Sequence, residues 1–394
     1  MKLLFDLNSL RLPRSGVGYY TQHLLEGVLD DPDVTDVAGW IGRTVVRGDD
    51  LRAMLGAQPQ RGSRAVARDG RAMQLLQKAR ALPGLYAART MARGLASHSI
   101  RNAFAREGYV YHETNSVASR YRGRKVVTIH DLSHRRYPAF HPRSAVNFLE
   151  RGLPRSLKQA DIVIADSFYT KKEIVDIYGI DADKIVPIHL GVEPAFQPRS
   201  PEVCDPALRA LGLKAKGFVL SVCTLQPRKN LRRLVEGFAR LTPDLREAFP
   251  LVLVGADGWD NSELKRMIEP MVRAREVIPA GYVSRADLLQ LYSSAAVFAY
   301  PSLYEGFGLP VAEAMASGVP VLTSTATSIP EVSAGAAWEV DPFSVEAITD
   351  GLERLLTDQS LRAQLIGKGL RRAAELSWGE TVRKTCEVYR RLAP

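Results

Sequence analysis

The chain has 394 residues, of which 46% are hydrophobic and 24% are charged, as is ordinary for a globular protein with two or three domains. No stretch approaches the roughly 18 apolar residues of a membrane-spanning helix, and the start MKLLFDLNSL reads as a first strand rather than a signal peptide. Three scattered cysteines exclude a disulfide framework or a zinc site. We therefore expect a cytoplasmic protein that needs no metal.

The net charge of +10 is concentrated in the first half of the chain. Residues 51–125 hold 15 basic against 3 acidic side chains, while residues 201–394 hold 23 of each. The basic segment also carries apolar residues at helical spacing between Met73 and Leu82. Peripheral contact with an acidic membrane and an ordinary solvated surface both fit this pattern. Nucleic acid is disfavoured, because zinc-finger spacing and an aromatic-rich RNA-binding signature are both missing.

Strand-like runs alternate with helical patterns along the first half of the chain. The expected elements are, in order, the strand KLLFDL, a helix from about Tyr19 to Leu29, the strands KVVTIHDL and DIVIADS, a helix from Thr170 to Tyr178, and the strand KIVPIHLGV. This alternation predicts βαβ units and a parallel sheet.

The alternation stops around residues 194–216, where four prolines and the absence of a strand pattern predict a linker. It then resumes with the strand GFVLSVCTL, helix 231–241, PLVLVGAD, helix 262–274, VIPAGYV, helix 285–294, AVFAYPS, helix 310–316 and GVPVLTS. A second doubly wound sheet follows from this order. We expect domains at 1–198 and 199–377 that face each other across a cleft, with the final helix, about 378–394, packing back onto the first.

The most specific motif is the segment YEGFGLPVAE, residues 304–313, which follows a strand and runs into a helix. Pro310 suits the first helical turn, while Gly306 and Gly308 permit tight backbone and close approach of a ligand. The free backbone amides at the start of this helix would face an anion, and they belong to Phe307, Gly308 and Leu309.

Two carboxylates flank these glycines, Glu305 in the loop and Glu313 in the helix. Each can accept hydrogen bonds from a pair of vicinal hydroxyls, one pair on a sugar and the other on a ribose. Solvated glutamates beside a capped helix are the simpler alternative.

A second motif is Pro227-Arg228-Lys229-Asn230, between a strand and a helix. Arg228 and Lys229 would stand at the carboxyl end of the strand, where two cations can hold a diphosphate. Asn230 is a natural N-cap for the following helix. A basic turn is more often merely solvated, but its pairing with the glutamate motif in one sheet favours a site.

Two weaker motifs lie in the first half. Gly16 and Gly18 in SGVGYY follow the first strand and would allow close approach of a phosphate or sugar, although the spacing is not GxGxxG. His130, followed by Asp131, ends a strand, where it either hydrogen-bonds a substrate or is a structural histidine.

Taken together, these motifs resemble the family-4 class of retaining glycosyltransferases with the GT-B fold, over nearly the whole chain. HDLSHRRYPAFHP and DIVIADSFYTKKEIVDIYGI are similar to the mannosyl- and rhamnosyltransferase-like members that build bacterial surface polysaccharides. Two departures lie in the diphosphate loop, where Cys223 replaces the usual glycine and Gln226 the usual acidic residue. Both lie beside the expected donor site, so the resemblance defines the reaction class and not the particular sugar and nucleotide.

The resemblance implies roles for particular residues. Glu305 would hold the donor sugar, Glu313 the ribose, and His130 would line the reaction centre; we count His130, Glu305, Arg228 and Lys229 as catalytic. Base packing is implied around Tyr282 and Val283. The remaining donor-binding residues are those of the two motifs and the N-terminal glycines, namely Gly16, Gly18, Arg228, Lys229, Phe307, Gly308 and Leu309.

The resulting hypothesis is a retaining hexosyltransferase without metal or cofactor. It would move a mannose- or rhamnose-type sugar, best from a GDP-sugar, to a hydroxyl of a glycan that is attached to a lipid. The reaction would be front-face displacement through an oxocarbenium-like state, with closure over the donor. The alternatives are a nucleotide-sugar epimerase, a glycan phosphorylase, or a non-catalytic nucleotide-sugar-binding protein.

Overall fold

The computed structural model describes residues 1–11, 16–42, 44–56, 98–256, 258 and 262–393. The chain folds as two compact units. Unit 1 comprises residues 1–166, 170–188 and 378–394, and unit 2 comprises residues 167–169 and 189–377. Residues 189–198, which the sequence analysis placed in the first domain, thus belong to unit 2. Among the described residues, none of the helices has both the length and the apolar character to cross a membrane.

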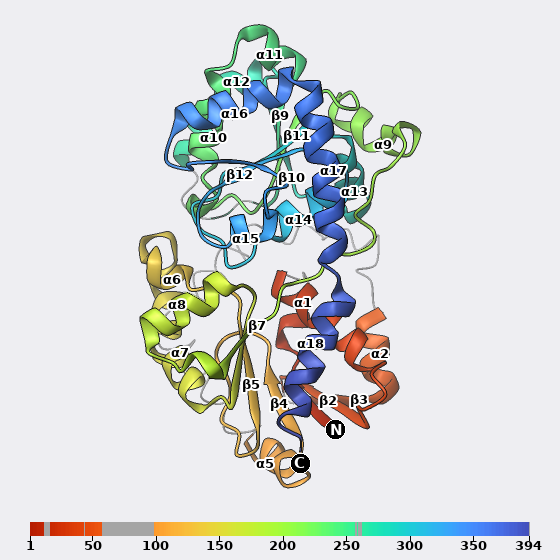
Figure 1. Cartoon of the computed structure of the whole chain (residues 1–394), viewed down its shortest axis with the longest axis vertical. Helices are drawn as coiled ribbons and strands as arrows, with labels where there is room; N and C mark the ends of the chain where they lie inside the picture. The colour runs from red at the N-terminus through yellow and green to blue at the C-terminus, as the bar shows by residue number, and fades with distance from the viewer. Residues whose placement is uncertain (12–15, 43, 57–97, 257, 259–261, 394) are drawn as a thin grey trace, which may run out of the picture. The chain divides into compact units, whose positions relative to one another are not determined.

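Unit 1 is built on a seven-stranded sheet in the order β3-β2-β1-β4-β5-β6-β7, parallel except for the edge strand β3 (Figure 1). Its strands are β1 Lys2–Asp6, β2 Asp36–Ile41, β3 Thr44–Arg47, β4 Val110–Glu113, β5 Lys125–Ile129, β6 Ile162–Ala165 and β7 Ile185–Pro187. Its helices are α1 Gly16–Val28, α2 Gly48–Gly56, α5 His98–Arg106, α6 Ser133–Arg136, α7 Arg143–Gln159, α8 Phe168–Tyr178 and α18 Trp378–Arg390, with short turns η1 Asn8–Leu10, η2 Pro138–Phe140 and η3 Ala182–Lys184.

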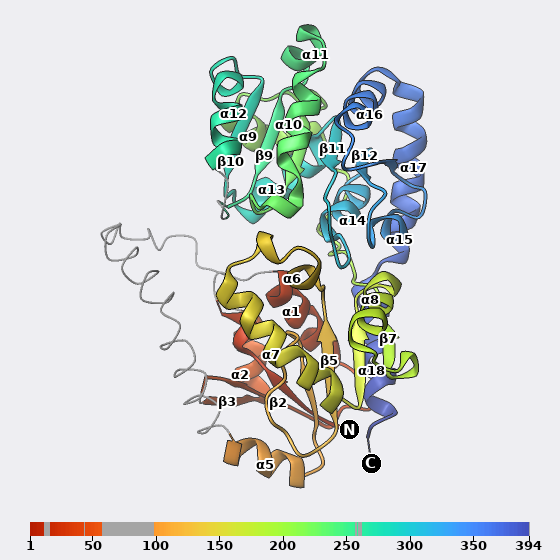
Figure 2. The ribbon, with the colours of Figure 1, turned by 90° about the vertical axis from the view of Figure 1, so that its left-hand side faces the viewer.

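Unit 2 is built on a six-stranded parallel sheet in the order β10-β9-β8-β11-β12-β13 (Figure 2). Its strands are β8 Val219–Val222, β9 Leu251–Val254, β10 Val277–Gly281, β11 Val297–Tyr300, β12 Val321–Ser324 and β13 Trp338–Val340. Its helices are α9 Pro201–Leu211, α10 Leu231–Ala239, α11 Pro243–Ala248, α12 Ser262–Arg273, α13 Arg285–Ser294, α14 Leu309–Ala316, α15 Ile329–Ser333, α16 Val345–Thr357 and α17 Gln359–Glu375, with the turn η4 Pro227–Lys229.

Helices of unit 2 fall into two groups, as a doubly wound sheet requires. Helices α10, α12 and α16 share one core with the strands, and α14 contacts α13, α15 and α17. The predicted fold class, α/β with two Rossmann-like parallel sheets, is confirmed. The strand order reverses between β1 and β4 in unit 1 and between β8 and β11 in unit 2. Ligands of such sheets bind outside the carboxyl ends of the strands at this switch point.

The segment predicted as a linker contains a helix instead. Helix α9 begins with Pro201 in its first turn, where the missing amide costs nothing. Cys204, Ala207 and Leu208 on one face are buried, and the helix packs against α13. Proline content therefore misled the sequence analysis, because one of the four prolines starts a helix.

The final helix, α18, is part of unit 1 and lies against α1 (Figure 1). Gly27 permits this approach, since a Cβ there would lie 2.6 Å from Cγ2 of Val382. The hydroxyl of Tyr389 hydrogen-bonds Nδ1 of His112 at 2.6 Å, and Nε2 of that ring hydrogen-bonds Thr128 Oγ1 at 2.7 Å. Burial lowers the pKa of His112 to about 3, so the ring is neutral.

Candidate active site

The cations of unit 2 follow strand β8 at the switch point. The chain turns through η4, and Asn230 then adopts φ 60°, in the left-handed region that asparagine tolerates. The Asn230 side chain makes no cap hydrogen bond, contrary to prediction. Its Nδ2 instead donates to the carbonyls of Pro301 and Pro342, at 2.9 and 2.7 Å. These bonds tie the basic turn to the loops that follow β11 and β13.

Five residues from these two loops form one hydrogen-bonded group, here called the Glu305 cluster. Its members are Arg228, Lys229, Tyr300, Ser302 and Glu305. Oε1 of Glu305 accepts from Lys229 Nζ at 2.6 Å, Tyr300 OH at 2.9 Å and Ser302 Oγ at 2.6 Å. Oε2 accepts from Arg228 Nη1 at 3.2 Å. The structure thus brings together three of the four residues predicted to be catalytic, and adds Tyr300 and Ser302, which sequence reasoning missed.

The cluster is buried except for Arg228, which is partly exposed, and its members include more cations than carboxylates. Burial alone would raise the pKa of Glu305, yet the charges of Lys229 and Arg228 outweigh it and bring that pKa to about 2. Burial lowers the pKa of Lys229, against the attraction of Glu305. Glu305 is 6% exposed and Lys229 8%. Counted over its own members, the Glu305 cluster contains two cations and one carboxylate, a balance that favours an anionic ligand.

Gln226 is a neutral hydrogen-bond partner of Arg228. Nε of Arg228 donates to Oε1 of Gln226 at 3.3 Å, and Nη1 donates to the Tyr304 carbonyl at 3.2 Å. A neutral amide therefore orients the guanidinium without cancelling its charge. An acidic residue at position 226, which the resemblance would lead us to expect, would add a negative charge beside Arg228.

Two hydroxyl groups, those of Thr327 and Ser328, hold the glycine loop that leads into α14. Ser328 Oγ donates to the carbonyls of Glu305 and Phe307, at 3.0 and 2.9 Å, and Thr327 Oγ1 accepts from the Glu305 amide at 3.0 Å. Gly308 has φ 110°, and a Cβ there would meet Cδ1 of Ile329 at 2.5 Å. Only glycine fits this position.

This loop leaves the amino terminus of α14 available to a ligand. Within the described part of the chain, no group accepts a hydrogen bond from the amides of Phe307, Gly308 and Leu309. The first amides of a helix have no intrahelical acceptor, and the helix dipole favours an anion there. Free amides and the positive charge of the Glu305 cluster thus occur in one loop system.

Glu313 lies inside α14 and is not a member of the cluster. Its Oε2 accepts from Tyr292 OH at 2.9 Å. Burial raises the pKa of Glu313 to about 7, although the charge of Arg285 opposes the rise. Near neutral pH this carboxyl can therefore accept or donate a hydrogen bond. Tyr282 follows β10 with 80% of its surface exposed, and Val283 is half-buried, so the ring is accessible to a flat ligand.

The N-terminal glycines make a less defined contribution. Gly16 is the first residue of α1, and a Cβ there would meet nothing within 4 Å. Gly18 is buried in the first turn. Residues 12–15, which complete the predicted loop, lie outside the described residues, as do residues 57–97, which form most of the basic segment 51–125.

His130 of unit 1 is held by two acceptors. Its Nδ1 donates to Asp166 Oδ2 at 2.7 Å, and its Nε2 donates to the Thr114 carbonyl at 2.8 Å. A carbonyl can only accept, so Nε2 carries a proton, and Nδ1 faces the Asp166 carboxylate. Burial would lower the pKa of His130, but the charge of Asp166 and the hydrogen bonds to Asp166 and Thr114 together outweigh burial and raise that pKa. Both ring nitrogens are therefore engaged by protein groups.

Asp166 is a candidate site residue in unit 1 that sequence reasoning missed. It follows β6, is 2% exposed, and its Oδ1 has no hydrogen-bond donor among the described residues. A buried carboxylate oxygen without a donor is costly, and a ligand hydroxyl would satisfy it. Its position after DIVIA, at the same sheet edge as His130, was the available signal.

Two doubly wound units, one with a cation-rich anion site at its switch point, are the arrangement of a GT-B glycosyltransferase. Comparison with known proteins agrees. Residues 209–372 match "Glycosyl transferases group 1", and residues 64–196 match "Glycosyltransferase Family 4". The chain is 32% identical over 395 residues to O-antigen chain mannosyltransferase B of Escherichia coli, with 100% of both chains covered. It is also 32% identical over 246 residues to the serotype-specific mannosyltransferase WbdA of Escherichia coli, covering 60% of this chain and 29% of WbdA.

Solved structures share the fold at low sequence identity. HepE of Anabaena, crystallised with UDP and glucose, has a TM-score of 0.70 and 18% identity, with 100% of each chain covered. WaaG, a glycosyltransferase involved in lipopolysaccharide biosynthesis, has a TM-score of 0.67 and 17% identity, covering 98% of this chain and 99% of that one. The chain belongs to the glycosyltransferase family of the O-antigen mannosyltransferases, and it is a transferase.

The His130–Asp166 pair leads to a testable prediction. Asp166→Asn removes the charge that raises the pKa of His130, so that pKa should fall by roughly one unit or more. Because the folded-state pKa is raised, the pair stabilises the protein at acidic pH, and this contribution is lost as the pH rises through the folded-state pKa. A titration of the ring by NMR measures both variants.

Asp131→Asn is the matched control, because Asp131 is adjacent but bonds the amide and hydroxyl of Ser133. Its charge is the weakest of the causes acting on the pKa of His130, so the fall should be smaller. An unchanged His130 titration in Asp166→Asn would show that the ring is not held as a cation by this carboxylate.

Proposed function

We propose that this glycosyltransferase moves a hexose of the mannose or rhamnose type from a nucleoside-diphosphate sugar, best a GDP-sugar, to a hydroxyl of a lipid-linked bacterial glycan, with retention of anomeric configuration. The full-length similarity to an O-antigen chain mannosyltransferase supports the sugar and the acceptor. The complex of HepE with UDP and glucose supports a nucleoside-diphosphate donor, although with another base and sugar. The named relatives are transferases, which favours transfer over epimerisation or phosphorolysis.

The observation that carries this proposal is that Arg228 and Lys229 converge on Glu305 in the same loop system as the amides at the start of α14. A diphosphate would accept from both sets of donors. Arg228 offers a planar fork and Lys229 a compact charge. Glu305 bonds Lys229 at 2.6 Å and Arg228 at 3.2 Å, and its Oε2, with one donor among the described residues, retains capacity for a sugar hydroxyl.

The reaction follows from this electrostatic arrangement. The bond from the anomeric carbon to the diphosphate oxygen breaks, and negative charge grows on the leaving group where the cations and amides lie. The acceptor oxygen bonds to the anomeric carbon on the same face, and its proton passes to the departing phosphate oxygen. His130, whose pKa is raised, would place positive charge at the carboxyl end of β5 rather than abstract a proton.

The location belongs to the same proposal. We place the enzyme in the cytoplasm at the inner face of the membrane, because a lipid-linked acceptor would be presented there. The basic segment, residues 51–125, would supply peripheral contact with acidic lipid.

Arg228→Ala and Lys229→Ala, singly and together, should lower kcat/KM by roughly 10²–10³-fold, because each removes stabilisation of the leaving diphosphate. Initial rates with the nucleotide-sugar donor measure this. Thermal melting curves of the variants must accompany the rates, because each substitution removes a hydrogen-bond donor to the buried Glu305 and so changes the stability of the fold. Arg232→Ala is the control, because this exposed arginine pairs with Glu236 and Glu263 outside the site. Full activity of the double variant would end the proposal.

One reaction tests retention and metal independence together. With EDTA present, the product should form at the unperturbed rate, because Arg228, Lys229 and the helix terminus supply the positive charge that a metal would otherwise provide. NMR of the product should show the anomeric configuration of the donor. An inverted product would refute retention, and activity that returns only with added Mg²⁺ would refute metal independence.

A further inference from the structure

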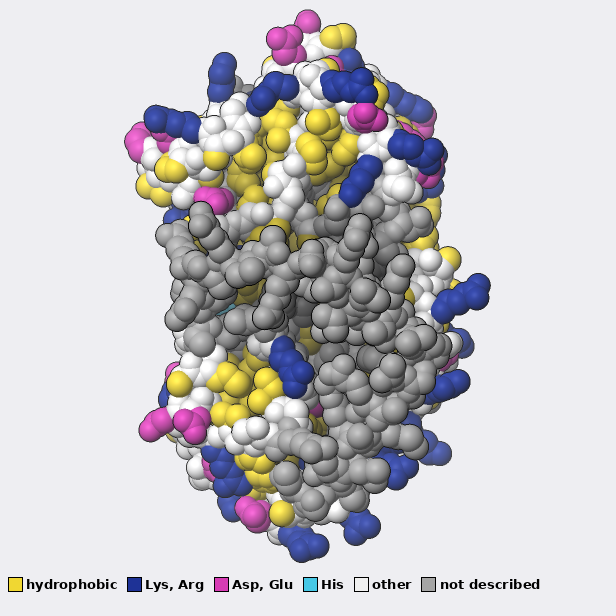
Figure 3. All heavy atoms as spheres, turned by 180° about the vertical axis from the view of Figure 1, so that it is seen from behind, with side chains coloured by type: hydrophobic (Ala, Val, Ile, Leu, Met, Phe, Trp, Pro, Cys, Tyr) yellow, Lys and Arg dark blue, Asp and Glu magenta, His cyan; other side chains and the backbone are white. Residues whose placement is uncertain are grey.

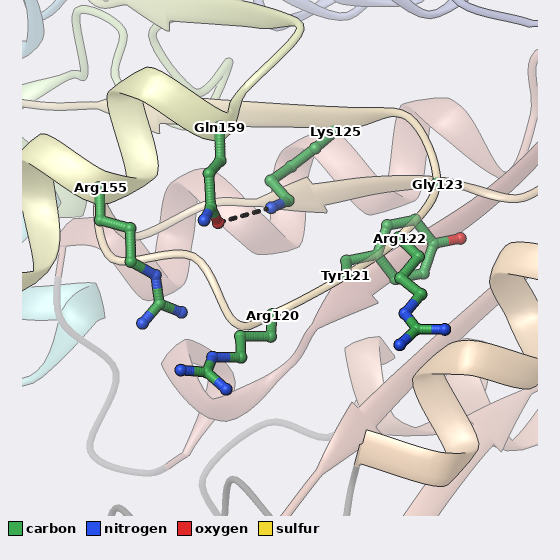
Figure 4. Close-up of a pocket in the computed structure, with 7 residues that line it drawn as sticks. All are labelled: Arg120, Tyr121, Arg122, Gly123, Lys125, Arg155 and Gln159. Atoms are coloured by element: carbon green, nitrogen blue, oxygen red, sulfur yellow. Dashed lines mark hydrogen bonds between the residues drawn. The ribbon is translucent and has the colours of Figure 1, made fainter.

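Unit 1 contains a hollow far from the carboxyl ends of its strands, here called the edge pocket. It has a volume of about 580 Å³ and is formed by the loop before β5 and the last turns of α7. Its lining residues are Arg120, Tyr121, Arg122, Gly123, Lys125, Arg155 and Gln159. Figure 4 shows the Arg120 and Arg155 side chains extending toward the same part of the hollow, while Lys125 meets Gln159.

The lining carries four cations and no acidic residue. Within the described residues, the side chains of Arg120, Arg122 and Arg155 make no ion pair or hydrogen bond. Lys125 is 2% exposed, and its Nζ makes one hydrogen bond, to Gln159 Oε1 at 3.5 Å. A nearly buried ammonium with a single long bond to a neutral amide is an energetically poor arrangement in the absence of an anion.

The neighbouring carboxylate does not compensate this charge. Asp161 pairs with Arg124 at 2.8 Å and accepts from the backbone amide of Lys125 at 2.8 Å. Burial lowers the pKa of the Lys125 ammonium, the charge of Arg155 lowers it further, and Asp161 opposes this less strongly. The cations of the pocket therefore repel one another with little relief from the protein.

Of the four cations that line the pocket, only Arg155 occupies a position where a positive charge would stabilise the protein without a ligand. Arg155 lies in the last two turns of α7, where positive charge favours the helix dipole, but Lys158 is also there to supply it. Arg120 and Arg122 belong to a loop and have no dipole to offset. Lys and Arg side chains gather at this end of unit 1 in Figure 3.

The edge pocket is distinct from the candidate active site. Lys125 is the first residue of β5, and His130 directly follows its last residue, so the two lie at opposite ends of this strand. Five residues of strand separate them by roughly 17 Å. A ligand in the pocket therefore does not take part directly in the chemistry at His130.

We propose that the edge pocket binds a phosphate-bearing anion through Arg120, Arg122, Lys125 and Arg155. Arginine forks match phosphate oxygens bidentately, and the nearly buried lysine supplies a fixed charge at the side of the pocket. A free phosphate compound and the phosphate of a lipid headgroup share this chemistry. Three of these cations, Arg120, Arg122 and Lys125, belong to the basic segment 51–125, so a lipid headgroup in the pocket would deepen the membrane contact proposed above. Binding of a free phosphate compound stands apart from the proposed function, because it does not require glycosyl transfer.

The test is the double variant Arg120→Ala/Arg155→Ala beside Lys158→Ala, an exposed lysine on α7 that does not line the pocket. Calorimetry with inorganic pyrophosphate should show two sites in the parent protein, one at the Glu305 cluster and one at the edge pocket. The double variant should lose the second site or weaken it by roughly tenfold or more, and Lys158→Ala should keep both. Circular dichroism verifies that the variants are folded.

A second arm distinguishes the sources of the phosphate. Sedimentation with phosphatidylcholine vesicles, with and without phosphatidylglycerol, is measured on the same three proteins. Loss of pyrophosphate binding alone in the double variant assigns the pocket to a free phosphate compound, and loss of binding to the acidic vesicles assigns it to a lipid headgroup. Equal binding of both probes by the double variant and Lys158→Ala would overturn the inference.

Discussion

The candidate site depends on one electrostatic constraint: two cations, buried Lys229 and partly buried Arg228, share the single buried carboxylate of Glu305 at the switch point of the unit 2 sheet. Burying charge is costly unless it is paired and hydrogen-bonded. Glu305 meets that condition through four donors, yet Arg228 and Lys229 together carry one positive charge more than it neutralises. A protein selected for stability alone gains nothing from this surplus. It becomes useful when a diphosphate occupies the site and acquires further charge during bond cleavage.

The parallel sheet makes this arrangement possible. Strands β8 and β11 are neighbours in space although they are far apart in sequence, and their carboxyl ends deliver the basic turn and the glutamate loop to one edge. Asn230 then fixes the loops to each other, and Ser328 and Thr327 hold the glycine loop open. Unit 1 applies the same principle differently, because adjacent strands β5 and β6 bring His130 and Asp166 together.

The sequence predicted the fold class and the major strands, because alternation of apolar runs with helical patterns is a strong local signal. It also identified Arg228, Lys229 and Glu305, since their residue types and positions after strands point to anion binding. It did not predict that Glu305 is bonded to both cations, or that Asn230 binds carbonyls rather than capping a helix. These contacts join residues more than 70 positions apart, and local patterns carry no information about them. Asp166 and the edge pocket were missed for the same reason. The Asp166 oxygen that has no donor among the described residues, and the convergence of the pocket cations, are visible only in three dimensions.

The most direct test of the central claim is equilibrium binding of a nucleoside diphosphate and its matching monophosphate to the parent protein and to Arg228→Gln. Calorimetry with whichever of GDP or UDP binds more tightly provides the comparison. If the cluster holds the terminal phosphate, the parent should prefer the diphosphate by roughly tenfold or more, and Arg228→Gln should lose most of that preference. An undiminished preference in the variant would show that the diphosphate is held elsewhere.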